Sequence, residues 1–165
     1  MRATASAQPN IALIKYWGKR DARRNLPAVG SISITLSELS TTMCVEFDSA
    51  LAGDLLTVNG RDNADMLPRV SRCLDTVAGE KRPGARVISQ SNFPIAAGLA
   101  SSASAFAALV VAADAAAGQT GSTEQLAELA GRASGSAARS LYGGFVELEN
   151  AGDGIALSCL RPAHD

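Results

Sequence analysis

The 165-residue sequence is short of several features that define common protein classes. It has one histidine, His164, beside the C-terminus, so a Ser/His/Asp triad or a histidine-based zinc site is not expected. Its three cysteines form no CxxC pair, and their odd number does not suit a disulfide framework. We therefore expect Cys44, Cys73 and Cys159 to be buried, reduced thiols that bind no metal.

Long apolar runs and an excess of one charge are also missing. The longest apolar run, residues 105–113, ends at Asp114 and is shorter than the roughly 20 residues that a membrane span needs. Residues 1–9 are small and polar, so they lack the apolar core of a signal peptide. The formal net charge of -1 gives no basic field that would attract nucleic acid or membranes. We expect no nucleic-acid partner, no membrane association and a cytoplasmic location.

The residues that are present fit one ordinary globular domain. Hydrophobic residues make up 47% and charged residues 19%, a balance that argues against disorder. At 165 residues the chain is long enough for one domain with a substantial core. Strand and helix patterns are mixed without strict β-α-β alternation, which favours an α+β fold.

Period-two alternation predicts half-buried strands along much of the chain. The strands are expected at residues 31–36, 41–47, 55–58, 85–93, 146–148 and 155–160. Asn59-Gly60 is a strong hairpin signal, and we interpret the first three strands as an antiparallel meander. The last two strands are expected to form a hairpin across residues 152–154.

Helical spacing of apolar residues predicts four helical segments. They are expected over residues 64–78, 102–117, 122 to about 134, and 136–141. The segment 102–117 is apolar on nearly all sides and is expected to be a central, buried helix. Ser122 or Thr123 is placed to cap the next helix, with Gln125 as the capping-box partner of Ser122.

The most informative stretch is NFPIAAGLASSA at residues 92–103. It combines a strand end, a glycine-bearing loop, two serines and the start of an alanine-rich helix. A helix that begins with Ser101-Ser102 presents backbone N–H groups and hydroxyls at its positive end, which suits a phosphate. No lysine follows the glycine as it does in the common P-loop. On this stretch alone, a tight turn with a Ser-capped helix is an equally good interpretation.

Two further clusters carry groups that suit an anionic ligand. NIALIKYWGKR at residues 10–20 brings lysines and Tyr16 into a short span, although a strand edge with solvated lysines explains its composition better. SGSAARSLYGG at residues 134–144 places Ser136 and Arg139 on one face of a helix, where they can hold a carboxylate or phosphate. A polar helix end with an ordinary surface arginine is the simpler alternative.

Together the three clusters resemble the mevalonate diphosphate decarboxylase family of the GHMP kinase superfamily. The matching stretches occur in family order over essentially the whole chain, at residues 10–26, 31–36, 92–103 and 134–144. KYWGK with AAGLASSA is specific, because kinases of the superfamily tend to carry a second glycine where Ala96 or Ala97 stands. The resemblance implies an α+β GHMP-type N-terminal domain over residues 1–165, ribosomal protein S5 domain 2-like, with a mixed or antiparallel sheet packed against helices.

The activity implied by the resemblance is ATP-dependent decarboxylation of (R)-5-diphosphomevalonate to isopentenyl diphosphate, a step of isoprenoid biosynthesis in the mevalonate pathway. ADP, phosphate and carbon dioxide are released. In the family, ATP phosphorylates the tertiary 3-hydroxyl, and loss of that phosphate drives decarboxylation. The implied cofactors are ATP and Mg²⁺, and the family's common homodimeric state is left open for this chain.

The resemblance also assigns roles to residues. The catalytic residues it implies are Lys15, Ser102 and Arg139. The substrate's diphosphate and carboxylate would be held by Asn10, Tyr16, Lys19, Ser134, Ser136 and Arg139. The nucleotide phosphates would contact Ala97, Gly98, Leu99, Ala100, Ser101 and Ser102. Mg²⁺ would arrive with ATP, with Ser102 as its one candidate contact, and such charge neutralisation suits phosphoryl transfer.

The sequence departs from the family in its length. Family members carry a second domain after the region matched here, and the aspartate thought to act on the 3-hydroxyl lies in that domain. We therefore expect the C-terminal GHMP domain to be absent, so that the chain is a fragment, a truncation product or one piece of a split enzyme. Two alternatives stay open: a phosphomevalonate decarboxylase or mevalonate kinase-like relative, and a non-catalytic binding module.

Overall fold

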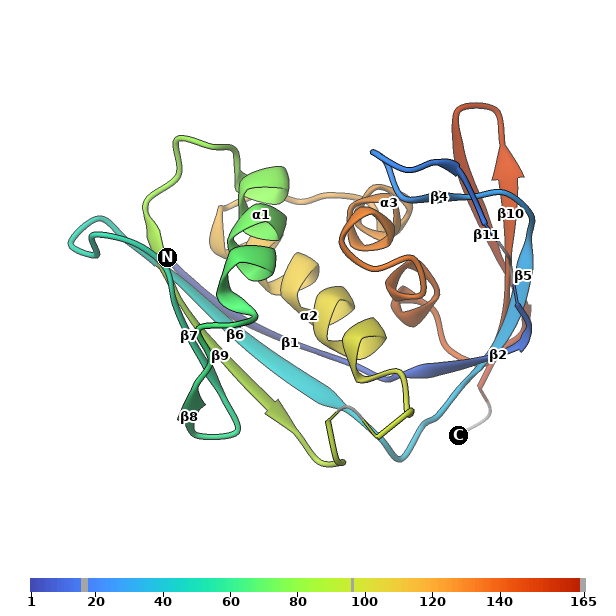
Figure 1. The fold of residues 1–165 in the computed structure, drawn as a ribbon, viewed down its shortest axis with the longest axis horizontal. Helices are drawn as coiled ribbons and strands as arrows, with labels where there is room; N and C mark the ends of the chain where they lie inside the picture. The colour runs from blue at the N-terminus through green and yellow to red at the C-terminus, as the bar shows by residue number, and fades with distance from the viewer. Residues whose placement is uncertain (16–17, 96, 164–165) are drawn as a thin grey trace.

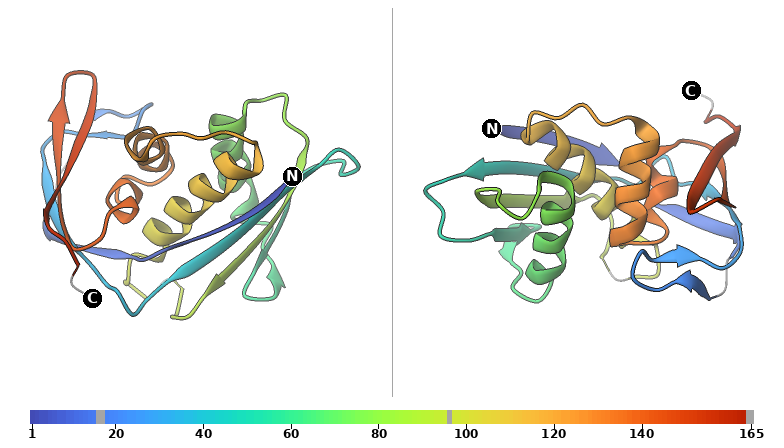
Figure 2. Two further views of the ribbon diagram at one scale, coloured as in Figure 1. Left: turned by 180° about the vertical axis from the view of Figure 1, so that it is seen from behind. Right: turned by 90° about the horizontal axis from the view of Figure 1, so that it is seen from above.

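The structure, a computed structural model, describes residues 1–15, 18–95 and 97–163. Two sheets lie at an angle to each other, and the helices fill the space between them (Figure 1). The views from behind and from above show the same arrangement, with the helices on one side of the longer sheet (Figure 2). The predicted α+β class is confirmed.

The first sheet has five strands in the order β1-β6-β9-β7-β8. These are β1 (Arg2–Ala7), β6 (Thr41–Asp48), β9 (Gly84–Ser91), β7 (Leu55–Val58) and β8 (Arg61–Asp62). β7 and β9 pair in parallel, whereas the other neighbours are antiparallel. The predicted hairpin at Asn59-Gly60 is confirmed between β7 and β8, and both residues have the positive φ that a tight type I′ turn requires.

The second sheet has four antiparallel strands in the order β11-β10-β5-β2. They are β2 (Asn10–Ile14), β5 (Ser31–Thr35), β10 (Phe145–Ala151) and β11 (Gly154–Arg161), and a two-stranded ribbon is formed by β3 (Lys19–Asp21) and β4 (Leu26–Pro27). The predicted hairpin of β10 and β11 is confirmed.

The predicted antiparallel meander of β5, β6 and β7 is wrong. β5 belongs to the second sheet, β6 to the first, and β7 pairs with β9 rather than with β6. Alternation reports which face of a strand is buried but not which strand lies beside it. Because the two sheets cover different sides of the helices, strands that follow each other in sequence separate into different layers.

β5 also reverses the usual distribution of polar and apolar side chains. Its buried positions are Ser31 and Ser33, at 3% and 0% exposure, whereas Ile32 and Ile34 are half-buried. The inner face of β5 therefore presents hydroxyl groups to the helices, which prepares a polar site at this point of the core.

The helices are α1 (Leu67–Ala78), α2 (Ser101–Ala116), α3 (Thr123–Ala133) and the 3-10 helix η1 (Ala137–Leu141). α2 is the predicted central helix: Ala107, Ala108 and Ala112 are fully buried, and the helix packs on β1, β6, η1 and α3. Small side chains allow this close approach to the sheet. The predicted capping box of Ser122 and Gln125 is confirmed at the start of α3.

The cysteines are all free, but their burial differs from the expectation. Cys73 is buried and Cys44 half-buried, whereas Cys159 is exposed because it lies on the edge strand β11.

No helix within the described ranges is long and apolar enough to cross a bilayer. The cytoplasmic location stays a prediction.

Candidate functional site

A buried polar cluster joins η1 to the second sheet through Arg139. This side chain is only 2% exposed, and its Nη1 donates to Ser31 Oγ of β5 at 2.7 Å. Its Nε and Nη2 donate to Asn10 Oδ1 of β2 at 3.3 and 3.2 Å. Asn10 Nδ2 in turn donates to the Ser136 carbonyl at 2.9 Å and to Ser140 Oγ at 2.8 Å. Two strands and one helix are thereby locked together.

The cluster changes the interpretation of Arg139. An ordinary surface arginine was the simpler alternative, and its burial excludes that. Asn10 Oδ1 and Ser31 Oγ accept hydrogen bonds from Arg139 and hold its side chain in place. A guanidinium donates charge-assisted hydrogen bonds to a carboxylate or phosphate.

The two serines predicted to bind substrate lie at the turn into η1. Ser134 is the C-cap of α3 and is buried, and its carbonyl accepts from the Ala137 N–H at 2.7 Å. Ser136 is the N-cap of η1 and is half-buried. Because Ser136 is held by Asn10 and precedes Arg139 by three residues, the structure brings these three predicted residues together.

The predicted lysines lie at the surface. Lys15 directly follows β2, and Lys19 begins β3; both are exposed. Tyr16 lies outside the described residues. No contact among described residues joins either lysine to Arg139, so the structure leaves the lysines apart from the buried cluster. The Arg20 guanidinium donates to the Gly152 and Gly154 carbonyls and so ties β3 to the β10–β11 turn.

The glycine-bearing loop ends at the positive end of α2. Its residues Ala97 and Gly98 are exposed, and Leu99 and Ala100 half-buried. The N-cap is Ala100, with φ of 51° and no side-chain hydrogen bond to the helix, so the alternative of a Ser-capped helix is wrong. Ser104 Oγ bonds to Thr41 Oγ1 at 2.8 Å and to the Ser101 carbonyl at 3.1 Å, which fixes the first turn against β6.

A cavity of about 380 Å³ lies beside this first turn. Ser101 and Ser102 line it from α2, Arg69 from α1 and Met43 from β6, and Met66, the N-cap of α1, lines it too. Its size and its largely apolar walls with a few polar groups are typical of small-molecule sites. Sequence analysis missed the walls from β6, β7 and α1, because they are distant along the chain and carry no motif.

Ser31 and Ser140 are two further members of the buried cluster that sequence analysis missed. Serines on alternate positions of β5 were a usable signal, since they occupy the inward face.

The search for metal ligands gives a negative result for the described residues. Within residues 1–15, 18–95 and 97–163, no group of three His, Cys, Asp or Glu side chains could hold an ion.

Comparison with known proteins decides the family. The Diphosphomevalonate decarboxylase-like N-terminal domain matches residues 7–159. The chain belongs to this family. The diphosphomevalonate decarboxylase of Homo sapiens is 42% identical over 164 residues, which cover 88% of this chain and 40% of that protein. That of Eremothecium gossypii is 40% identical, covering 89% of this chain and 41% of the relative.

Solved structures of the family share the fold. Mevalonate diphosphate decarboxylase from Staphylococcus aureus superposes with a TM-score of 0.87 at 40% identity, over 98% of this chain and 51% of that one. A structure of MDDEF in complex with MVAPP, AMPPCP and magnesium gives a TM-score of 0.88 at 36% identity, over 98% and 51% of the two chains.

The resemblance found in the four sequence stretches is thus confirmed. The chain spans about half the length of these structures and about two fifths of the two curated relatives.

Proposed function

We propose that this chain is the N-terminal, ligand-binding part of a diphosphomevalonate decarboxylase, which converts (R)-5-diphosphomevalonate and ATP to isopentenyl diphosphate, ADP, phosphate and carbon dioxide. The observation that carries the proposal is the buried Arg139 cluster of η1, packed against the helix α2 whose positive end follows the glycine-bearing loop. Two features that stabilise anions therefore occur in packed neighbouring elements, in a member of this family.

The substrate's anionic groups are assigned to the cluster and its rim. Ser136 and Arg139 supply hydrogen bonding and charge at η1, and Asn10 positions both. The exposed Lys15 and Lys19 are free to turn toward a diphosphate, since a lysine ammonium acts as a mobile point charge. The roles of Tyr16 and Ser134 stay predictions from the family resemblance.

ATP is assigned to the cavity beside α2. Its apolar walls suit a nucleoside, while the loop at residues 97–100 and the first turn of α2 suit the phosphates. The described donors near this point are the Ser101 and Ser102 hydroxyls rather than carboxylates. That donor set fits a Mg²⁺ ion held mainly by the phosphates, with Ser102 as the protein contact. Mg²⁺ would neutralise charge on the transferred group.

We assign the complete catalytic reaction to a longer protein or a complex of which this chain is one part. The matched structures are about twice as long, and none of the chain's aspartates falls in the motif that supplies the family's acid-base residue. Leu13 and Ile14 at the end of β2 are each 57% exposed, which leaves apolar surface next to the lysines for a second domain to cover.

The test compares equilibrium binding of mevalonate 5-diphosphate and mevalonate 5-phosphate by calorimetry. The proposal predicts at least about tenfold tighter binding of the diphosphate, because one more charged group is engaged. Lys19→Gln should reduce this preference, and Arg61→Gln, an exposed arginine on β8, should leave it unchanged. Preference for the monophosphate would favour the phosphomevalonate relative, and binding of neither ligand would favour a non-catalytic module.

A further inference from the structure

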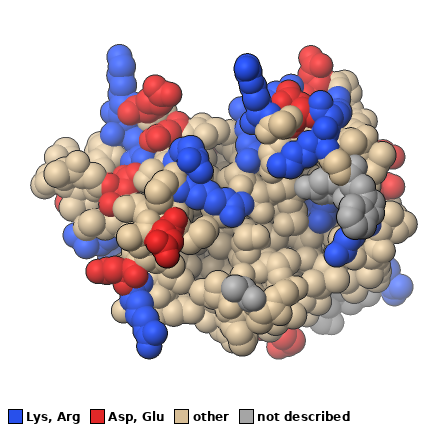
Figure 3. All heavy atoms as spheres, viewed as in Figure 1, with Lys and Arg blue, Asp and Glu red and all other residues tan. Residues whose placement is uncertain are grey.

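A second cavity, of about 370 Å³, is lined by five arginines. It lies between α1, α3 and the turn that joins β3 to β4. The arginines are Arg23 and Arg24 from the turn, Arg69 and Arg72 from α1, and Arg132 from α3. Figure 3 shows basic side chains gathered over α1 and α3 on this face. One third of the 15 lysines and arginines of the chain therefore meet in one cavity, although the net charge is -1.

The positive charge of this arginine cavity is not balanced by its acidic neighbours. Glu128 bonds to Arg132 at 2.8 Å and to Arg24 at 3.2 Å, and these contacts lower its pKa, the Arg132 hydrogen bond most. Asp21 accepts from the backbone N–H groups of Arg23 and Arg24 but does not line the cavity. Cys73 lines it as a neutral thiol, because burial raises its pKa to about 12.

Part of the cavity wall is rigid. The Arg69 guanidinium lies over the Phe106 ring, 4.4 Å from its centroid, and donates to the Ala133 carbonyl at 2.8 Å. Burial lowers the pKa of Arg69, and the neighbouring Arg72 lowers it further. Such crowding of like charges is unfavourable and is relieved by an anion.

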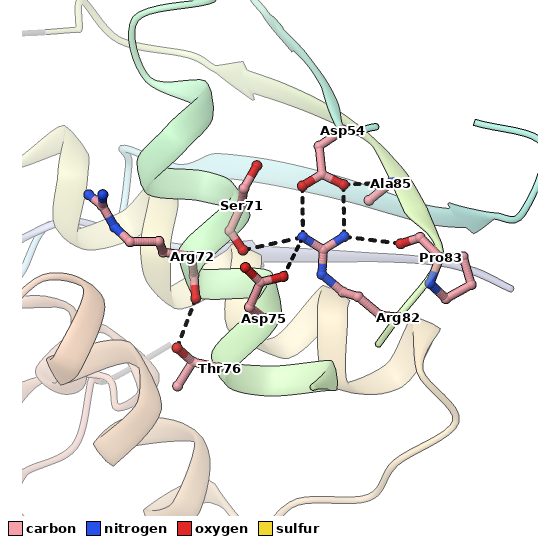
Figure 4. Close-up of polar contacts among 8 residues, drawn as sticks. All are labelled: Asp54, Ser71, Arg72, Asp75, Thr76, Arg82, Pro83 and Ala85. Carbon is pink, nitrogen blue, oxygen red and sulfur yellow. Dashed lines mark hydrogen bonds and ion pairs between the residues drawn. The ribbon is translucent and has the colours of Figure 1, made fainter. Parts of the chain in front are cut away.

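Two of the arginines have donors to offer a ligand. Among the described residues, neither the Arg23 nor the Arg72 side chain forms a hydrogen bond or a close ion pair, although the charge of Arg23 helps to lower the pKa of the nearby Asp21 carboxyl, less than the Arg24 N–H hydrogen bond does. Figure 4 shows the Arg72 guanidinium directed away from the neighbouring Asp54–Arg82 pair. Planar guanidinium forks match phosphate oxygens bidentately.

We propose that the arginine cavity binds a small ligand carrying a diphosphate group, at a site separate from the proposed substrate and ATP sites. Neither Arg139 nor Lys19 lines this cavity, and of its lining residues only Arg69 also lines the cavity assigned to ATP. Arg69 and Phe106 stand between the two cavities, so occupancy of one can alter the other through this shared wall.

The experiment titrates inorganic diphosphate, and separately isopentenyl diphosphate, into the protein at low ionic strength by calorimetry. The double variant Arg23→Gln/Arg72→Gln removes two exposed arginines of the cavity, and Arg61→Gln/Arg86→Gln removes two exposed arginines on the first sheet as a charge-matched control. We expect the cavity variant to lose about tenfold or more in affinity, since each lost hydrogen bond is charge-assisted. We expect the control pair to bind as the wild type does.

The two titrants distinguish the source of the diphosphate group: tighter binding of the inorganic ion indicates a free anion, and tighter binding of the prenyl compound indicates an ester. Unchanged diphosphate affinity in the cavity variant would overturn the proposal, as would an equal loss in the control pair or no binding to the wild type. Both titrants can also bind at the proposed substrate site, but the cavity variant leaves Lys19 and Arg139 in place. A loss of affinity in that variant therefore reports on the arginine cavity and not on the proposed function. Thermal unfolding of each variant checks that it is folded.

Discussion

At the scale of single residues, Arg139 is the side chain on which the candidate site depends. It connects η1 to β2 and β5 through Asn10 and Ser31, residues more than 100 positions away in the sequence. A buried arginine is tolerated in the folded protein only when hydrogen-bond acceptors are available for its N–H groups. Arg139 therefore has a structural role in addition to the proposed electrostatic one.

Removal of the Arg139 side chain should destabilise the protein. In Arg139→Ala, Asn10 Oδ1 and Ser31 Oγ lose their donors, so we expect the free energy of unfolding to fall by about 2–4 kcal/mol. Urea denaturation measures this. The exposed control Arg61→Ala should change it by less than about 0.5 kcal/mol. A variant as stable as the wild type would show that the cluster does not support η1.

A second buried charge pair, Asp54 and Arg82, fastens the start of β7 to the segment between α1 and β9 (Figure 4). Both carboxylate oxygens accept from Arg82 at 2.7 Å, and the Ala85 N–H donates to Asp54 at 2.9 Å. Arg82 also contacts Asp75 at 2.8 Å. Burial acts to raise the pKa of Asp54, but the hydrogen bonds and charge of Arg82 with the Ala85 N–H outweigh it, so the net pKa is lowered.

This lowered pKa fixes the direction of a pH effect. The stability that ionised Asp54 contributes is fully present above the unfolded pKa of about 3.9 and is lost as pH falls through the lower folded pKa. Asp54→Asn should cost about 3–5 kcal/mol at neutral pH, because it leaves Arg82 without its main partner. The difference from the wild type should shrink below about pH 4.

Urea unfolding across pH tests the Asp54 effect, with the exposed Asp153→Asn as control. A stability difference between Asp54→Asn and the wild type that stayed constant down to acid pH would mean that ionisation of Asp54 contributes nothing.

At the scale of elements, α2 shows how close packing depends on small side chains. Ala112 is fully buried, whereas Ala115 on the same helix is exposed. Ala112→Leu should destabilise the fold by about 1–3 kcal/mol through overpacking. Ala115→Leu adds the same atoms where there is space and should be within about 0.5 kcal/mol of the wild type. Thermal unfolding of the pair measures this, and equal losses would show that the effect is not one of burial.

Sequence patterns predicted most elements because each depends on local chemistry. The strand at β9, the capping box at Ser122 and the turn at Asn59-Gly60 follow from alternation, side-chain capping and positive φ. Strand partners depend instead on contacts between distant segments, which is why the meander was wrong. The same limit applies to the site: its motifs were visible, but the burial of Arg139 depends on inward-facing serines in another element.

At the scale of the whole molecule, both edge strands of the second sheet carry exposed apolar side chains. Leu13 and Ile14 of β2 and Leu160 of β11 are each more than half exposed. The matched structures continue for about as many residues again. We therefore expect the isolated chain to bind ligands but to turn over far more slowly than about 10 per second, the median for enzymes. A coupled assay for ADP release measures this rate.

The most direct test of the proposed function follows the labelled carboxyl group of mevalonate 5-diphosphate. The protein, purified from its host at its natural length, is supplied with ATP, Mg²⁺ and substrate carrying ¹³C in that group. We predict equal amounts of labelled carbon dioxide, isopentenyl diphosphate and ADP. Formation of ADP and a phosphorylated substrate without labelled carbon dioxide, or no reaction at all, would contradict the assignment of this chain to a decarboxylase.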